Sequence, residues 1–178
     1  CKGDVIMKAL IAIDIQNDFV SGSLGTTEAE AALAKMVEEI NSPKYDMVFA
    51  TQDTHDRNYL NTLEGKYLPV VHCIKGTEGW KFPKSIEEAL HKRNAKIFEK
   101  DTFGSLDLAV ELQKLAPEEI VLIGICTDIC VVTNALLLRT YLPNTKITVL
   151  SQACAATTID KQKEALDVMA SCQIEIEK

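Results

Sequence analysis

Residues 119–140, EIVLIGICTDICVVTNALLLRT, decide the fold. The run 119–123 is short, almost wholly apolar and rich in Ile, Val and Leu, which predicts a strand covered on both faces. The polar pair Thr127-Asp128 follows, and the chain is then apolar almost all round over 128–140. This segment therefore predicts a buried strand that leads through a short turn into a buried helix.

The rest of the chain repeats this alternation. Five other short apolar runs predict strands, over 8–13, 46–50, 96–99, 146–150 and 173–177. Amphipathic helical patterns lie between them, over 28–40, 84–92, 106–115 and 160–171. Alternating strands and helices predict an α/β fold with three layers, α/β/α, around a mainly parallel, doubly wound sheet of about six strands. At 178 residues we expect a single domain over 1–178, with 1–6 as an extension before Met7.

Composition excludes several classes of partner. The formal net charge is −7 and no basic patch stands out, so we expect no nucleic-acid partner. No apolar stretch is long enough to span a membrane, which predicts a cytoplasmic protein without a membrane partner. The six cysteines lack the small, loop-rich setting of a disulfide framework, and we expect most of them to be reduced, buried thiols.

Reactive side chains follow four of the predicted strands. They are Asp14 after 8–13, Asp53 and His55 after 46–50, Lys100 after 96–99, and Cys130 after 119–123. Parallel sheets bind ligands outside the carboxyl ends of their strands, so these groups should converge on one edge.

Cys130 is the predicted nucleophile. It lies in the first turn of the predicted helix, where Thr127-Asp128 would cap the helix, and the helix N-terminus and Lys100 would lower the thiol pKa. Asp14 interrupts an apolar strand, and a carboxylate with a pKa raised by burial suits a general base. The plainer alternatives are a core cysteine and a structural Asp14–Lys100 pair. Convergence of the three groups favours catalysis.

A metal site is the second hypothesis. Asp53 and His55 are two residues apart, so they point to one side of an extended strand end, and His72 is available as a third ligand. One Asp and two His suit a divalent first-row metal, zinc first, with iron or manganese as alternatives. Glu64 lies between the two histidines as a candidate fourth ligand. The alternative for each histidine is a structural, hydrogen-bonded side chain.

Several separated motifs occur together in one order. They are Ile13-Asp14-Ile15-Gln16-Asn17-Asp18-Phe19, Asp53-Thr54-His55, His72-Cys73-Ile74-Lys75-Gly76-Thr77, Lys100-Asp101-Thr102-Phe103-Gly104-Ser105 and Gly124-Ile125-Cys126-Thr127-Asp128-Ile129-Cys130-Val131. In this set the chain resembles the isochorismatase-like cysteine hydrolases, and among them it is most similar to nicotinamidases. The resemblance covers essentially the whole chain from Met7.

The resemblance implies a function for most of these residues. It implies a catalytic triad of Asp14, Lys100 and Cys130, and a metal held by Asp53, His55 and His72. It implies a cis peptide before Cys126 and an oxyanion hole made by the backbone N–H groups of Cys126 and Cys130. It implies a substrate pocket walled by Phe19, Trp80 and Phe103, a small amide substrate such as nicotinamide, and a homo-oligomer.

Two departures from the family pattern bear on substrate choice. Leu106 stands where an aromatic residue is frequent, and Cys126 stands where a small non-thiol residue is frequent, so both are expected to alter the pocket. One alternative is a related amidase for carbamoyl or ureido compounds, although such enzymes generally lack the metal ligands. Another is a non-enzymatic redox sensor or binding protein in which Cys126 and Cys130 form a switchable disulfide.

Overall fold

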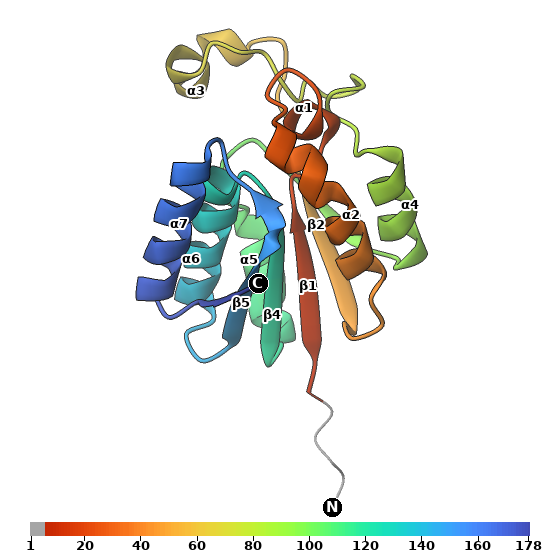
Figure 1. The fold of residues 1–178 in the computed structure, drawn as a ribbon, viewed down its shortest axis with the longest axis vertical. Coiled ribbons are helices and arrows are strands. Elements are labelled where there is room, and N and C mark those ends of the chain that lie inside the picture. The colour runs from red at the N-terminus through yellow and green to blue at the C-terminus, as the bar shows by residue number, and fades with distance from the viewer. Residues whose placement is uncertain (1–5) are drawn as a thin grey trace, which may run out of the picture.

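The computed structural model describes residues 6–178 and contains one parallel sheet of six strands (Figure 1). The strands are β1 (Lys8–Ile13), β2 (Met47–Asp53), β3 (Lys96–Lys100), β4 (Glu119–Ile125), β5 (Lys146–Ala155) and β6 (Glu175–Glu177). Their order across the sheet is β3-β2-β1-β4-β5-β6, and every adjacent pair is parallel. The chain moves outward from β1 in one direction and from β4 in the other. The predicted doubly wound sheet is confirmed.

Helices cover both faces of the sheet and complete the three predicted layers (Figure 1). One face carries α2 (Thr27–Asn41) and α4 (Lys84–Lys92), and the other carries α5 (Leu106–Leu115), α6 (Val132–Tyr141) and α7 (Ile159–Ser171). Shorter pieces lie near the carboxyl edge of the sheet: α1 (Asn17–Val20), a turn of 3₁₀ helix η1 (Tyr59–Asn61), α3 (Leu63–Tyr67) and a turn of π-helix η2 (Thr127–Val131).

Alternate residues of each central strand feed two separate cores. In β1, Leu10 and Ala12 pack with α2 and α4, whereas Ala9, Ile11 and Ile13 pack with α5, α6 and α7. Both faces of the strand are therefore buried, which explains why its sequence is continuously apolar.

Local sequence fixes the helix starts and one close strand contact. Thr26, Ser105 and Thr158 each cap a long helix by accepting a hydrogen bond from the third residue beyond. Gly124 has φ +131°, and a Cβ there would lie 2.1 Å from the carbonyl oxygen of Ile13. Only glycine fits this close approach of β4 to β1.

The structure corrects several predicted boundaries. β2, β4 and β5 run two to five residues beyond the predicted ends, to Asp53, Ile125 and Ala155, and the last strand shrinks to Glu175–Glu177. The predicted helix 128–140 begins as the π-turn η2, and only one face of α6 is fully buried because the other lies at the surface.

Two expectations concern the ends and membrane contact. Apart from Ile6, the predicted extension 1–6 lies outside the described residues. Within residues 6–178 no helix has the length and apolar character needed to cross a membrane.

Candidate active site

The sheet brings four predicted residues to one edge. Asp14 follows β1, Asp53 ends β2, Lys100 ends β3, and Cys130 lies in η2, which follows β4. Asp53 and Lys100 are register partners across β2 and β3. The expected convergence at the carboxyl ends of the strands is therefore observed.

Asp14, Lys100 and Cys130 form one buried cluster. The Lys100 Nζ lies 2.6 Å from Asp14 Oδ2 and 3.6 Å from Cys130 Sγ, and it also donates to the Thr102 carbonyl at 3.0 Å. Asp14 Oδ1 accepts a hydrogen bond from the Thr51 hydroxyl at 2.7 Å. Asp14 has φ +46°, a left-handed conformation that a non-glycine residue adopts at a cost of about 1 kcal/mol or more. The fold holds this carboxylate toward the lysine and the thiol.

Burial affects the pKa of all three groups in this cluster. It raises the pKa of Asp14, despite the opposing effect of Lys100. It also raises the pKa of the Cys130 thiol, and the neighbouring Asp14 charge raises it further. Burial lowers the pKa of Lys100, but the charges of Asp14, Cys130 and Asp53 outweigh it, so this pKa is raised. Lys100 lowers the pKa of the thiol as predicted, but desolvation and the like charge of Asp14 outweigh it, so the predicted net lowering of this pKa is wrong.

The predicted helix cap is also wrong. The Asp128 carboxylate accepts hydrogen bonds from the backbone N–H and the hydroxyl of Thr157, at 2.9 and 2.5 Å, and does not cap the turn before Cys130. The Thr127 hydroxyl is buried and has no protein partner. The peptide bond between Ile125 and Cys126 is cis, as the resemblance implied.

Asp53, His55 and His72 meet as the metal hypothesis requires. One donor atom from each lies within 4.8 Å of the other two, and all three side chains are buried. The Asp53 Oδ2 is 2.9 Å from His55 Nε2 and 3.5 Å from His72 Nε2. His72 Nδ1 lies 2.8 Å from the Val70 carbonyl oxygen, which can only accept, so Nδ1 carries the proton and Nε2 offers its lone pair to the cluster.

This donor set fits a divalent metal. A carboxylate and two neutral imidazoles are ligands of zinc and its first-row neighbours. Glu64 Oε1 lies 3.7 Å from Nε2 of both histidines, so it faces the same centre. Burial raises the pKa of Glu64. For Asp53, burial also acts to raise the pKa, but the neighbouring His55 and His72 side chains and Lys100 outweigh it, so this pKa is lowered.

Two side chains that the sequence interpretation left without a role support this cluster, the buried Gln16 and the half-buried Asp18. Gln16 donates from Nε2 to the carbonyl oxygens of Asp53 and Trp80, both at 2.8 Å, and accepts at Oε1 from the Asp53 N–H at 2.7 Å. Asp18 Oδ2 accepts from the Cys73 N–H at 2.8 Å, next to His72. Their polar character inside the motif at 13–19 was the only signal in the sequence.

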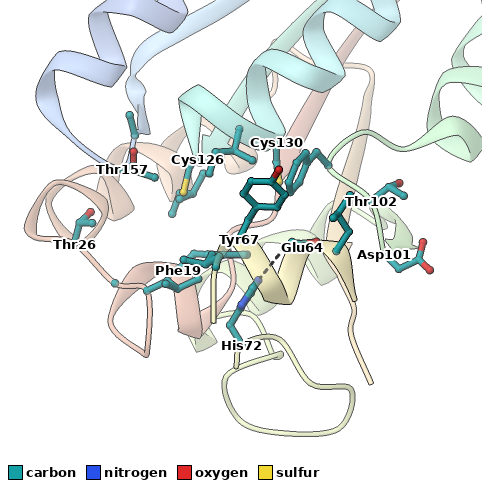
Figure 2. Close-up of a pocket in the computed structure, with 18 residues that line it drawn as sticks. Phe19, Thr26, Glu64, Tyr67, His72, Asp101, Thr102, Cys126, Cys130 and Thr157 are labelled. Atoms are coloured by element: carbon teal, nitrogen blue, oxygen red, sulfur yellow. Dashed lines mark ion pairs between the residues drawn. The ribbon is translucent and has the colours of Figure 1, made fainter. Parts of the chain in front are cut away.

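A cavity of about 910 Å³ is lined by the nucleophile Cys130 and by His72 of the metal cluster (Figure 2). Cys130, Cys126 and Ile129 line one part of it, and Phe19, His72 and Glu64 line another. Its outer wall includes Leu63, Tyr67 and Phe103. The cavity is mostly apolar, with polar groups confined to a few positions, as is typical of small-molecule sites.

Phe19 and Phe103 lie where they were expected, but Trp80 does not. The Trp80 indole donates to the Thr54 hydroxyl at 2.9 Å, outside the lining of the cavity. Of the two departures from the family pattern, Cys126 lines the cavity, whereas Leu106 is 61 % exposed at the start of α5 and does not. The proposed effect of Leu106 on the pocket therefore has no structural basis.

The comparisons with known proteins agree with this fold and site. The Isochorismatase domain matches residues 8–177, so the chain belongs to the isochorismatase family. The isochorismatase family protein PncA of Bacillus subtilis is 33% identical over 178 residues, covering 92% of this chain and 94% of the relative. The nicotinamidase/pyrazinamidase of Mycobacterium tuberculosis is 28% identical over 191 residues, covering 96% and 98%.

Solved structures extend the likeness to three dimensions. The nicotinamidase PncA from Bacillus subtilis superposes with a TM-score of 0.83 at 26% identity, covering 97% of this chain and all of the other. The pyrazinamidase of Pyrococcus horikoshii, solved in complex with zinc, gives a TM-score of 0.79 at 25% identity, covering 96% and 98%. This chain is an amidohydrolase of the same kind.

Proposed function

We propose that this chain hydrolyses nicotinamide to nicotinic acid and ammonia through a thioester on Cys130. The observation that carries the proposal is the buried Asp14–Lys100–Cys130 cluster, whose Cys130 lines one cavity together with His72 of the metal cluster. The choice of nicotinamide as the substrate is supported by the nicotinamidases among the similar proteins and structures.

The first half of the reaction forms the thioester. Asp14 takes the proton of the Cys130 thiol, and the thiolate attacks the amide carbonyl carbon. The backbone N–H groups of Cys126 and Cys130 stabilise the oxyanion of the tetrahedral intermediate. When the intermediate collapses, the C–N bond breaks, and Asp14 returns its proton to the leaving nitrogen, which departs as ammonia.

The second half releases the acid. A water molecule loses a proton to Asp14 and attacks the thioester carbonyl, the C–S bond breaks, and the sulfur recovers a proton. Throughout, Lys100 balances the negative charge that moves between Asp14 and Cys130, because its ammonium contacts both groups. Phe19 and Phe103 provide apolar surface for an aromatic ring.

The metal would be held by Asp53, His55 and His72, with Glu64 as a fourth ligand, and zinc is our choice. When bound, it supplies a Lewis acid that orients the heteroaromatic ring of the substrate. Retention of this donor set disfavours the carbamoyl hydrolase alternative. The redox alternative leaves Asp14, Lys100 and the metal donor set without a role.

Ammonia release from nicotinamide tests this function. Purified protein is compared with the Cys130→Ala variant, each with and without a chelator. We expect release by the wild type, none by the variant, and a fall with chelator. Release that persists in Cys130→Ala would overturn the mechanism, and a wild type inactive on nicotinamide would overturn the substrate.

Assembly and location belong to the same proposal. We infer a homo-oligomer, as the family resemblance implies, and light scattering of the purified protein measures it. We also infer a cytoplasmic location, which the free thiols at Cys73, Cys126, Cys130, Cys154 and Cys172 support.

A further inference from the structure

The side-chain amide of Asn134 makes three hydrogen bonds to two backbone segments at the active site. Asn134 lies in α6 and is wholly buried. Its Nδ2 donates to the Cys130 carbonyl at 2.8 Å and to the Phe103 carbonyl at 3.1 Å, and its Oδ1 accepts from the Ser105 N–H at 2.9 Å. Both N–H groups and the oxygen are thus used, so the amide has one orientation only.

The loop that Asn134 holds is the wall of the cavity. Phe103 lies in the segment between β3 and α5, and 46 % of its surface is exposed, so the ring has little packing of its own. Gly104 packs against α6, where an added Cβ would lie 3.2 Å from Thr133 Cγ2 and 3.3 Å from Leu137 Cδ2. The position of the wall therefore depends on backbone anchors, and Asn134 supplies two of them.

The second N–H of the Asn134 amide holds the turn that carries the nucleophile. In η2 the Val131 N–H bonds to the Cys126 carbonyl, five residues back, so the turn is wider than an α-helix. The bond from Asn134 to the Cys130 carbonyl ties this wider turn to the first regular turn of α6.

We propose that Asn134 is a positioning residue, whose amide fixes the distance between the Phe103 wall and the Cys130 nucleophile. The inference rests on the proposed amide hydrolysis at Cys130. Because a misplacement of about 1 Å costs roughly a hundredfold in rate, the bond to the Cys130 carbonyl should govern kcat. The two bonds to the loop should govern KM, because they set the wall that contacts bound substrate.

Threonine at position 134 separates these two effects. Thr133 and Thr140, in the same helix, donate from their hydroxyls to the carbonyls four residues back, at 2.6 and 3.0 Å. A threonine at 134 would make the same bond to the Cys130 carbonyl. The threonine side chain is too short to bond to Phe103 or Ser105 as well. Asn134→Thr therefore keeps the hydrogen bond to the Cys130 turn and loses the two hydrogen bonds to the loop of Phe103.

The experiment compares Asn134→Ala, Asn134→Thr and the control Leu138→Ala, in which a buried side chain of the next turn of α6 is truncated. We expect Asn134→Ala to lower kcat at least tenfold and to raise KM. Asn134→Thr should recover most of kcat and keep the raised KM. Leu138→Ala should lower Tm by at least as much as either variant and leave kcat and KM near wild type. If Asn134→Ala does not fold, Asn134→Thr against wild type gives the same split.

A second readout does not need turnover. The rate at which iodoacetamide labels Cys130, followed by mass spectrometry of its peptide, should change in Asn134→Ala and stay near wild type in Asn134→Thr and Leu138→Ala. The proposal is overturned if Asn134→Ala matches Leu138→Ala in both labelling and kinetics, or if Asn134→Thr matches Asn134→Ala. A wild type without amidase activity, with these labelling differences intact, would instead overturn the proposed function alone.

Discussion

The Nζ of Lys100 lies 3.7 Å from Oδ1 of Asp53, so the ammonium of the catalytic cluster also contacts a carboxylate of the metal cluster. The contact follows from the sheet, because the two residues are register partners at the ends of β2 and β3. With Asp14 at 2.6 Å on its other side, Lys100 balances two buried carboxylates at once. The charges of the two clusters are therefore linked through one side chain.

Replacement of Lys100 by Met should lower stability and activity but leave metal binding unchanged. The change leaves Asp14 and Asp53 without their shared cation, and loss of one partner of a buried pair costs about 3–5 kcal/mol. Activity should fall by about a thousandfold or more. Metal content should be kept, because an ammonium near Asp53 repels a divalent cation.

Urea unfolding, ammonia release and elemental analysis measure these three quantities. Lys96→Met is the control, since Lys96 begins the same strand and forms a surface pair with Glu111 at 2.7 Å. Such a pair contributes at most about 1 kcal/mol. A Lys100→Met protein that is as stable and active as the control would contradict the assigned role.

The reaction of Cys130 with iodoacetamide should depend only weakly on pH. The pKa of Asp14 is raised by burial, and that of Cys130 is raised well above the ordinary value of a thiol by burial and by the Asp14 charge. Between these two pKa values the pair holds one proton. Within this interval the fraction with the proton on Asp14 and the charge on sulfur is independent of pH.

The Asp14→Asn variant reverses this behaviour. With no carboxylate to take the proton, the thiolate fraction rises about tenfold per pH unit below the thiol pKa. That pKa is also lower than in the wild type, because a like charge has gone. Labelling of Cys130 over pH 7–9, with stability checked at each pH, tests this; equal slopes in the two proteins would rule out Asp14 as the proton acceptor.

Glu64→Gln tests the fourth metal ligand. Glu64 Oε1 faces both histidines at 3.7 Å, and an uncharged amide is a weaker ligand than a carboxylate. We expect zinc affinity, measured by competition with a chelator, to fall by about tenfold. His72→Ala should lose more, and Glu78→Gln, an exposed position in the same long segment, should lose nothing. An unchanged affinity in Glu64→Gln would limit the site to Asp53, His55 and His72.

The features that the sequence predicted best are those that depend on local patterns, such as apolar periodicity and helix caps. The helices at 84–92 and 106–115 match α4 and α5 residue for residue, because their apolar periodicity and, for α5, the Ser105 cap are local properties. The convergence of Asp14, Lys100 and Cys130 was predictable as well, since parallel strands bring their carboxyl ends to one edge.

The predictions that were wrong, and the residues that were missed, depend on tertiary contacts. The raised pKa of Cys130 comes from burial, which a helix start and a nearby lysine do not reveal in sequence. Gln16 and Asn134 have ordinary spacing, and only the folded chain shows what their amides contact. Trp80 was placed in the pocket by the family resemblance, but its indole N–H donates to the Thr54 hydroxyl outside the cavity.

Two aromatic residues make a final test: Phe103, which lines the cavity as expected, and Trp80, which does not. Phe103→Ala removes a half-exposed wall of the cavity, and the loss of roughly 1 kcal/mol of apolar contact should raise KM about fivefold with little change in kcat. Trp80→Phe keeps most of the apolar ring but loses the hydrogen bond to Thr54, so it should lower Tm slightly and leave KM unchanged. Steady-state kinetics with nicotinamide and thermal unfolding distinguish these outcomes. A KM that rises in Trp80→Phe and not in Phe103→Ala would mean that Trp80, as the sequence first indicated, forms the wall of the pocket that substrate contacts.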